Sequence, residues 1–215
     1  MKKQLISIVT IFVLFLFPVA LSAGSPLSDG SDNIHIGVKG GLNLSNVYDT
    51  DNEDFRADPK LGFAAGAFVS IPLGSFLGIQ PEFLFSQRGY RGSGTVLFND
   101  YSYVRTANFV DVPILLAIKP TSMVTILVGP QYSYLVSERY VFTSDAVNLD
   151  IQDEYENDDI RRNTMCLTGG VDINISNIVI GARAGWDLLD NHVDGTTTTP
   201  RYKNMWTQLT LGLRF

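Results

Sequence analysis

At its C-terminal end the chain reads NMWTQLTLGLRF over residues 204–215, and apolar side chains alternate with polar or small ones. Met205, Leu209, Leu211, Leu213 and Phe215 fall on one set of alternate positions. Successive side chains of a β-strand point to opposite faces, so a period of two predicts a strand with one apolar and one polar face. We interpret residues 204–215 as a long strand of this kind.

The same alternation recurs along the rest of the 215-residue chain. Seven further segments show it, at residues 33–45, 61–71, 77–88, 110–119, 124–134, 164–175 and 178–187. Tight turns at 71–76, 119–122 and 176–177 alternate with long polar connections at 46–60, 89–107, 137–162 and 189–202. An even number of alternating strands, with turns at one end and loops at the other, is typical of outer-membrane barrels. We therefore predict an all-β fold, a closed eight-stranded antiparallel up-and-down transmembrane β-barrel with short periplasmic turns and long extracellular loops.

Alternation alone does not say which face points outward, so a soluble lipocalin-like binding barrel with an apolar pocket is a competing interpretation. The polar face carries many glycines, such as Gly66, Gly129 and Gly185. Glycine weakens a strand and has little use on a wet outer surface, whereas a crowded eight-stranded interior needs small side chains. Aromatic residues of the apolar face gather toward the loop ends, where an interfacial girdle would lie. These features favour the membrane barrel over the soluble one, with the apolar face of each strand toward lipid and the polar face toward the interior.

Three prolines conflict with uninterrupted strands. Pro81, Pro113 and Pro130 lie inside predicted strands, and each removes one hydrogen-bond donor from the ladder. We expect bulges or local bends at these positions.

The first residues have the features of an export signal. Lys2 and Lys3 precede an apolar stretch over residues 5–17, which ends at Pro18 and small residues. We predict a signal peptide over residues 1–22, with the cleavage site placed to within one residue, a periplasmic extension over 23–32 and the barrel over 33–215.

Composition excludes several classes of function. The formal net charge is −6 and no basic stripe is present, which argues against nucleic acid as a partner. One cysteine and two histidines cannot supply a disulfide framework or a zinc-type cluster.

Charged residues recur on the predicted inner face. They are Lys39, Glu82, Arg88, Asp111, Lys119, Asp172, Arg183, Asp187 and Arg214. Acids and bases nearly balance, and an eight-stranded interior is just wide enough for side chains to fill it. We expect paired charges that fill the lumen, and the alternative is a porin-like channel for a small solute or ligand.

Catalysis by an inner-face carboxylate pair, Glu82 with Asp111, is a further hypothesis. Nearby arginines would keep both acids ionised. His35 and His192 are expected at opposite ends of the barrel, and Cys166 faces inward among threonines, so no nucleophile with a base is assembled. We predict no enzymatic activity, no cofactor and no metal site.

Acidic residues cluster in the first and third long connections. They include Asp49, Asp51, Glu53, Asp54, Asp153, Glu154, Glu156, Asp158 and Asp159. Clustered carboxylates could bind Ca²⁺ or Mg²⁺, but residues 49–60 fail the EF-hand template, and solvated acidic loops are the simpler interpretation.

The second and third connections carry aromatic residues, namely Tyr90, Phe98, Tyr101, Tyr103, Tyr140, Phe142 and Tyr155. These could contact a protein or glycan, or pack the loops onto one another.

Three runs resemble the PorT-type outer-membrane β-barrel family. They are GIQPEFLFSQRG at 78–89, FVDVPILL at 109–116 and GPQY at 129–132. The resemblance covers essentially the whole mature chain and implies an eight-stranded barrel of the Gram-negative outer membrane, with prolines inside strands as part of the pattern. Where the family often has Glu, this chain has Asp111. The terminal Phe215 matches the aromatic signal that the assembly machinery reads.

The resemblance also bears on function. The member that gives the family its name is linked to protein secretion and gliding, and assigning that role to this chain would rest on fold analogy. We expect a monomeric, non-enzymatic protein of the bacterial outer membrane with a structural, surface-binding or secretion-associated role through its extracellular loops. Its expected partners are outer-membrane lipid, the assembly machinery, and a secretion component, surface protein or glycan at the loops.

Overall fold

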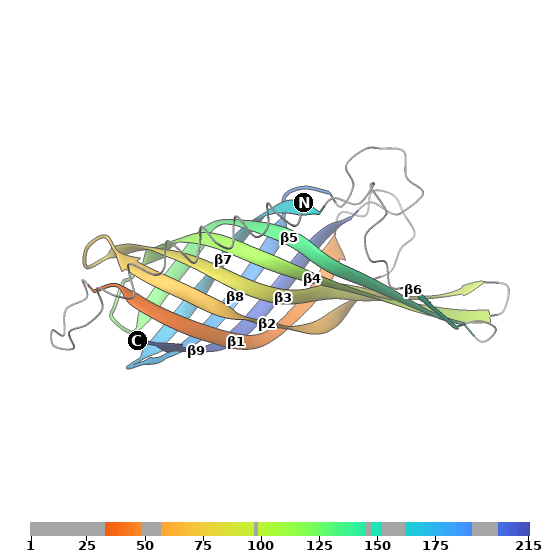
Figure 1. Cartoon of the computed structure of the whole chain (residues 1–215), viewed down its shortest axis with the longest axis horizontal. Helices are drawn as coiled ribbons and strands as arrows, with labels where there is room; N and C mark the ends of the chain where they lie inside the picture. Colours follow the sequence, from red (N-terminus) through yellow and green to blue (C-terminus); the bar gives the residue numbers. More distant parts are fainter. Residues whose placement is uncertain (1–32, 49–56, 97–98, 145–147, 152–161, 191–201) are drawn as a thin grey trace.

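The computed structural model describes residues 33–48, 57–96, 99–144, 148–151, 162–190 and 202–215. These ranges hold nine strands that wind around a common axis (Figure 1). They are β1 (His35–Tyr48), β2 (Ala57–Pro72), β3 (Leu77–Val96), β4 (Asn99–Ile118), β5 (Val124–Ser144), β6 (Asn148–Ile151), β7 (Asn163–Ile175), β8 (Ile178–Asp187) and β9 (Lys203–Arg214). In this part of the chain no helix has the length and apolar character needed to cross a membrane.

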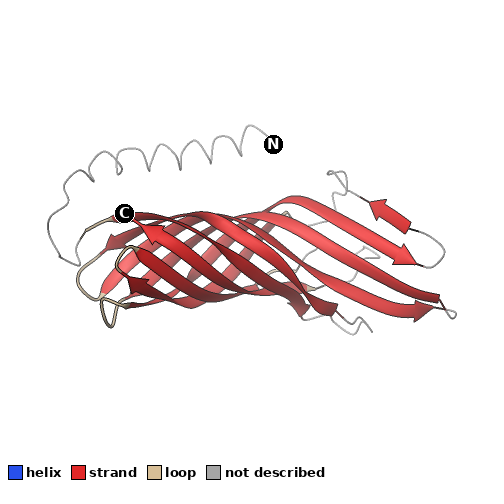
Figure 2. Ribbon diagram, turned by 90° about the horizontal axis from the view of Figure 1, so that it is seen from below, coloured by secondary structure: helices blue, strands red, loops and turns tan. Residues whose placement is uncertain are grey.

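Eight of these strands close into a barrel. Strands pair antiparallel in the order β1 to β5, β5 pairs with β7, and β8 and β9 follow. β1 pairs with β9 from Gly37↔Arg214 to Tyr48↔Lys203, so the first and last strands complete the ring. The four-residue β6 pairs with residues 140–143 of β5 beyond the barrel. The predicted closed eight-stranded antiparallel barrel is confirmed (Figure 2).

The turns at one end are as short as predicted. β2 ends at Pro72 and β3 begins at Leu77, and two residues separate β7 from β8. Gly74 has a φ of +134°, a conformation that side chains with a Cβ rarely adopt, so glycine suits this turn. The C-terminus lies at this same end (Figure 1).

At the opposite end the strands are longer than predicted. Residues 89–107 were expected to form a loop, but β3 and β4 stay paired from Gly89↔Thr106 to Val96↔Asn99. Likewise, the expected connections at 46–60 and 137–162 are shortened, since β1 reaches Tyr48 and β5 continues to residue 144. These predictions were wrong because water can wet both faces of a sheet outside the membrane, so pairing continues without a clear alternation of apolar and polar residues. The extended β3, β4, β5 and β6 protrude from the barrel in Figures 1 and 2.

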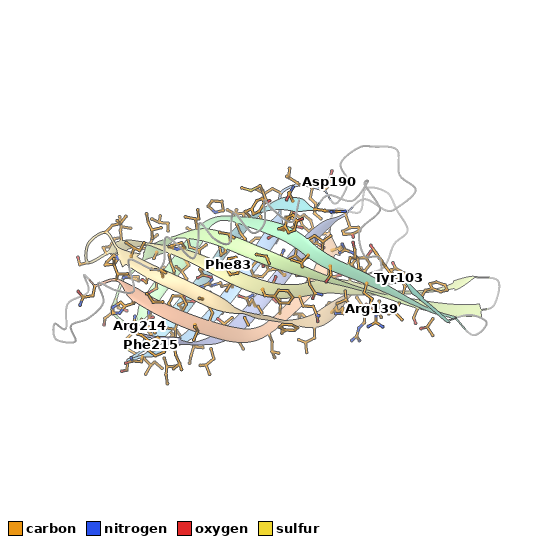
Figure 3. All side chains as sticks on the ribbon, viewed as in Figure 1. Phe83, Tyr103, Arg139, Asp190, Arg214 and Phe215 are labelled. Atoms are coloured by element: carbon orange, nitrogen blue, oxygen red, sulfur yellow. The ribbon has the colours of Figure 1, made fainter. Side chains whose placement is uncertain are left out.

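The outer wall is apolar and the interior is largely polar. Leu42, Ile114 and Leu211 are 57%, 56% and 61% exposed, whereas Asn43 and Glu82 are 0% exposed. In the view of Figure 3, side chains project outward along the upper and lower edges of the wall. The soluble lipocalin-like alternative is wrong, because the leucines and isoleucines cover the outside instead of enclosing a pocket.

Apolar side chains also lie inside the barrel. Phe68 interrupts the alternation of β2 and is 3% exposed, and Leu84, Leu115 and Leu127 are buried as well. The interior is therefore a packed core of ionic and apolar residues together.

The three in-strand prolines do not cause the bulges that were expected. The β3–β4 register is the same at Pro81↔Ile114 and at Leu84↔Asp111, and β5 pairs with β7 without a break through Pro130. The register shifts lie elsewhere, between Pro59 and Ala64 in β2 and between Asn108 and Phe109 in β4. Some residues beside the prolines have no partner in the pairing of neighbouring strands. The pairs before and after these residues keep the same register.

Candidate functional site

One group of charges crosses the lumen between strands on different sides of the barrel. We call Lys39, Glu82, Asp172 and Arg183 the first ion cluster. The Lys39 ammonium and the Arg183 Nη1 both donate to Glu82 Oε2, at 2.5 and 2.6 Å, and Arg183 Nη2 donates to Asp172 Oδ2 at 3.1 Å. Gln80 Nε2 donates to the other oxygen of Glu82 at 2.9 Å. Two cations and two carboxylates therefore neutralise one another inside the wall.

A second group lies among β3, β4 and β8. We call Arg88, Asp111 and Asp187 the second ion cluster. Arg88 Nη2 donates to Asp111 Oδ2 at 2.6 Å, and its Nη1 lies 3.9 Å from Asp187 Oδ1. The guanidinium also lies 4.8 Å from the ring centre of Phe109 and 5.0 Å from that of Trp206. Aromatic faces attract a desolvated cation, so these rings hold Arg88 across the axis.

The hypothetical catalytic pair is divided between the two clusters. Glu82 is held by Lys39 and Arg183, and Asp111 is held by Arg88 and by Ser86 Oγ, which donates to it at 2.5 Å. Cys166 is 0% exposed, and its thiol donates to Asp187 Oδ1 at 2.9 Å. Cys166 thus faces inward as predicted, in a setting that a substrate does not reach.

A third group lies at the extracellular end of the lumen. Arg105 of β4 pairs with Glu138 of β5, and its guanidinium lies 5.7, 5.1 and 5.9 Å from the ring centres of Tyr90, Tyr202 and Tyr140. We call these five residues the tyrosine cage. Beyond the apolar band, burial raises the pKa of the Tyr140 phenol to about 12, against the opposing effect of Arg105. The sequence analysis named Tyr90 and Tyr140 as loop aromatics that could pack together, but it did not predict their contact with Arg105, because it assigned all five residues to loops or loop ends.

Two predicted lumen charges lie apart from the ion clusters. Lys119 and Arg214 are half-buried at the short-turn end, where Arg214 donates to Ser176 O at 2.8 Å and to Asn174 Oδ1 at 3.4 Å. The prediction of one lumen network is corrected to this extent: seven of its nine members belong to the two clusters. His35 is half-buried at the same end, where it was expected.

Several predicted residues lie outside the described ranges. They are His192, Phe98, Tyr155 and the loop acids Asp49, Asp51, Glu53, Asp54, Asp153, Glu154, Glu156, Asp158 and Asp159. Within the described ranges, no group of three or more His, Cys, Asp or Glu residues could hold a metal ion.

Residues 26–192 match the family of the outer membrane protein beta-barrel domain. The chain belongs to this family. Its location is therefore the bacterial outer membrane, and its exposed leucines and isoleucines face lipid. No curated protein matches the chain.

Solved outer-membrane barrels resemble this family member at low identity. Ail, the attachment invasion locus protein of Yersinia pestis, is 16% identical, with 84% of this chain and 98% of that chain covered and a TM-score of 0.46. Neisserial surface protein A is 10% identical, with 84% and 97% covered and a TM-score of 0.47. OprG of Pseudomonas aeruginosa is 12% identical, with 86% and 98% covered and a TM-score of 0.47. Similarity at this level carries no information about ligands.

The outer surface of this outer membrane beta-barrel also shows where the hydrocarbon ends. Exposed Tyr132 and Trp186 lie toward the loop end of the apolar wall, as predicted for an interfacial girdle. Above the apolar positions of β3, β4 and β5, Gln87 Nε2 donates to Asn108 Oδ1 at 3.1 Å, and Asn108 Nδ2 donates to Ser137 Oγ at 2.8 Å. This row of polar side chains marks the upper edge of the lipid-facing wall, and the tyrosine cage lies on the extracellular side of it.

Proposed function

We propose that this barrel is a non-enzymatic and non-conducting scaffold that holds extracellular strands and loops for binding at the cell surface. The observation that carries the proposal is the filled lumen. Glu82 is 0% exposed, Arg88 1% and Arg105 2%, and these three residues belong to three successive groups along the axis. Side chains thus occupy the space that a water-filled pore would need.

The same packing argues against catalysis. A catalytic base or nucleophile must come within hydrogen-bond reach of a substrate. The inner carboxylates Glu82 and Asp111 are held by cations, and the Cys166 thiol is buried and hydrogen-bonded. The ion pairs within the two clusters support a structural role for these groups.

Single-channel recording in a planar bilayer tests the non-conducting part of the proposal. Purified wild-type protein is expected to give no discrete current steps, because the ion clusters and the tyrosine cage obstruct the axis. Detergent without protein is the control, and heat-modifiable gel migration shows that the added protein is folded. Reproducible steps that require folded wild-type protein would favour the porin-like alternative.

The binding part of the proposal rests on the extension of β3, β4 and β5. These strands carry paired backbone beyond the barrel to Val96↔Asn99 and Tyr101↔Ser144, which gives the adjoining loops a rigid support. A secretion component, as in the PorT-type resemblance, a surface protein or a glycan are the proposed partners. Phe215 is proposed to act as the recognition residue for the assembly machinery.

A shortened hairpin tests this surface role. Replacing residues 94–101 by an Asn-Gly turn keeps the pair Ser93↔Ser102 and removes the tip of the extension. Pull-down from intact cells is expected to lose bound secretion components or glycans with this variant, while its heat-modifiable migration stays unchanged. An identical set of bound molecules for both proteins would contradict the proposed binding role.

A further inference from the structure

A polar cavity lies on the extracellular side of the barrel, where β2, β3 and β4 run side by side. Its volume is about 340 Å³, and it is lined by Asp58, Arg91, Gly92, Ser102, Tyr103 and Val104. A cavity of this size with a few polar groups in its lining is typical of sites for small ligands. Figure 3 labels Tyr103 where β3 and β4 begin to protrude from the barrel. We call this cavity the β3–β4 pocket.

The two charged residues of the pocket point away from the lumen. Arg91 continues the outward positions of Phe85 and Gln87 along β3. Asp58 of β2 lies directly opposite Arg91 on one side, and Val104 of β4 lies opposite it on the other. Opposite residues of an antiparallel pair lie on the same face of a sheet, so these three side chains share the outer face of the wall.

This part of the outer face lies at the level of the lipid headgroups. Arg91 is four residues beyond Gln87, whose side chain belongs to the polar row at the upper edge of the lipid-facing wall. With a rise of about 3.3 Å per residue and a strand tilt of about 40°, Arg91 lies roughly 10 Å above that row. Headgroups add about 5–8 Å to each side of the hydrocarbon, and a long arginine side chain reaches back toward them. The Arg91 guanidinium is therefore placed to meet a headgroup phosphate.

Asp58 and Arg91 are both exposed, and neither forms an ion pair or a side-chain hydrogen bond within the described part of the chain. Their Cβ atoms are expected to lie about 5 Å apart, as in any directly opposite pair. Lys60 adds positive charge nearby, since burial lowers the pKa of its ammonium and Arg91 lowers it further. The pocket thus offers a carboxylate and an arginine, both open to a ligand that carries opposite charges of its own.

We propose that the β3–β4 pocket binds the phosphoethanolamine headgroup of a lipid in the extracellular leaflet, with Arg91 on its phosphate and Asp58 on its ammonium. A guanidinium forms strong charge-assisted hydrogen bonds with phosphate oxygens, and an ammonium has N–H groups to donate to a carboxylate. The exposed hydroxyl of Ser102 lines the same pocket. This lipid site is separate from the partner binding proposed for the loops, and neither depends on the other.

Other headgroups fit the two charges less well. A headgroup with negative charge alone would bring that charge beside the Asp58 carboxylate. A choline headgroup carries a phosphate for Arg91, but its quaternary ammonium has no N–H to donate to Asp58. Only a headgroup with both a phosphate and a protonated amine gives each side chain a hydrogen-bonded partner of opposite charge.

Native mass spectrometry tests this preference among lipids. The purified barrel in detergent is given equal amounts of phosphatidylethanolamine, phosphatidylcholine and phosphatidylglycerol with identical acyl chains. Phosphatidylethanolamine is expected to dominate the lipid adducts. Arg91→Gln is expected to reduce these adducts roughly fivefold, because the charged partner of the phosphate is lost. The control Lys203→Gln removes a cation from the extracellular end of β9 and is expected to leave the adducts unchanged.

Asp58→Asn isolates the recognition of the ammonium. This variant is expected to lose the preference for phosphatidylethanolamine over phosphatidylcholine while it still retains lipid through Arg91, and heat-modifiable migration verifies that every variant is folded. Equal retention of the three lipids by the wild-type protein overturns the proposal, as does a preference that survives in Arg91→Gln or Asp58→Asn. A preference for phosphatidylglycerol would replace the proposal with a simple anion site. Binding of water-soluble glycerophosphoethanolamine as tight as that of the lipid would contradict a lipid as the source of the headgroup.

Discussion

Glu82 shows how single residues hold this barrel together, because one of its oxygens accepts from both Lys39 and Arg183. These partners come from β1 and β8, whereas Glu82 belongs to β3. The cluster therefore links strands that are not neighbours in the sheet. Sequence alternation predicted that these residues face inward and pair, but it could not predict which acid meets which base, since that depends on the stagger of the closed barrel.

Replacing Glu82 tests the contribution of the first ion cluster to stability. Glu82→Gln leaves two buried cations with less compensation, and breaking a buried ion pair typically costs about 3–5 kcal/mol. We expect the free energy of unfolding in lipid vesicles to fall by roughly this amount. In the matched control, Asp190→Asn, an exposed partner of Lys203 at 3.7 Å is lost, and the expected change is below about 1 kcal/mol. Equal effects of the two substitutions would refute the role given to the cluster.

Gly37 explains the one break in the alternation of β2. A Cβ at Gly37 would lie 2.3 Å from Cζ of Phe68, whose ring points into the lumen. Gly37→Ala is expected to lower the free energy of unfolding by about 1–3 kcal/mol through overpacking. At Gly40 the nearest atom would be 3.7 Å away, so Gly40→Ala is the tolerated control.

A second substitution checks the cause of this effect. Combining Gly37→Ala with Phe68→Ala is expected to cost less than the sum of the single changes, although contact with the Leu213 carbonyl remains. Strictly additive losses of unfolding free energy would show that the Phe68 ring is not what excludes a side chain at position 37.

The strands could be predicted from the sequence where one face contacts lipid and the other faces the lumen, because the two faces then carry different kinds of side chain. Residues 178–187, for example, form β8 with the predicted limits. Beyond the membrane the contrast is lost, and the prediction of a loop over residues 89–107 failed there. Tyr90 continues the inward positions of Glu82 and Arg88, and Arg105 those of Asp111, so continued parity was the available signal for the tyrosine cage. In β5 this signal is hidden by the register shift opposite Asn108 and Phe109. The inward residues of β5 have odd numbers up to Leu135, but beyond the shift the inward residue is the even-numbered Glu138.

Hydrogen exchange of the extracellular strands tests their length. The backbone amides of residues 86–91 and 104–109 are expected to exchange slowly, because β3 and β4 remain paired through this region. The measurement is mass spectrometry of the barrel in detergent micelles, with the same protein unfolded in denaturant as the unprotected reference. Exchange at the rate of that reference would show that residues 89–107 form a loop after all.

On the scale of the whole molecule, the barrel separates two media. Its wall exposes leucine, isoleucine and aromatic side chains to lipid, and its interior combines two ion clusters, buried apolar residues and the tyrosine cage. The periodicity of the sequence was sufficient to predict this inside-outside arrangement. The exact lining of the lumen was not predictable, because residues such as Phe68 and Trp206 occupy it only through matching glycines on adjacent strands.

The two tryptophans test the central claim most directly, because Trp186 is 43% exposed on the outer wall and Trp206 is 4% exposed in the lumen. Each is studied alone, in Trp206→Phe and Trp186→Phe variants reconstituted in bilayers of brominated lipid. The fluorescence of Trp186 is expected to be strongly quenched and that of Trp206 to be nearly unaffected. Strong quenching of Trp206, or none of Trp186, would contradict a barrel with lipid outside and a filled lumen within.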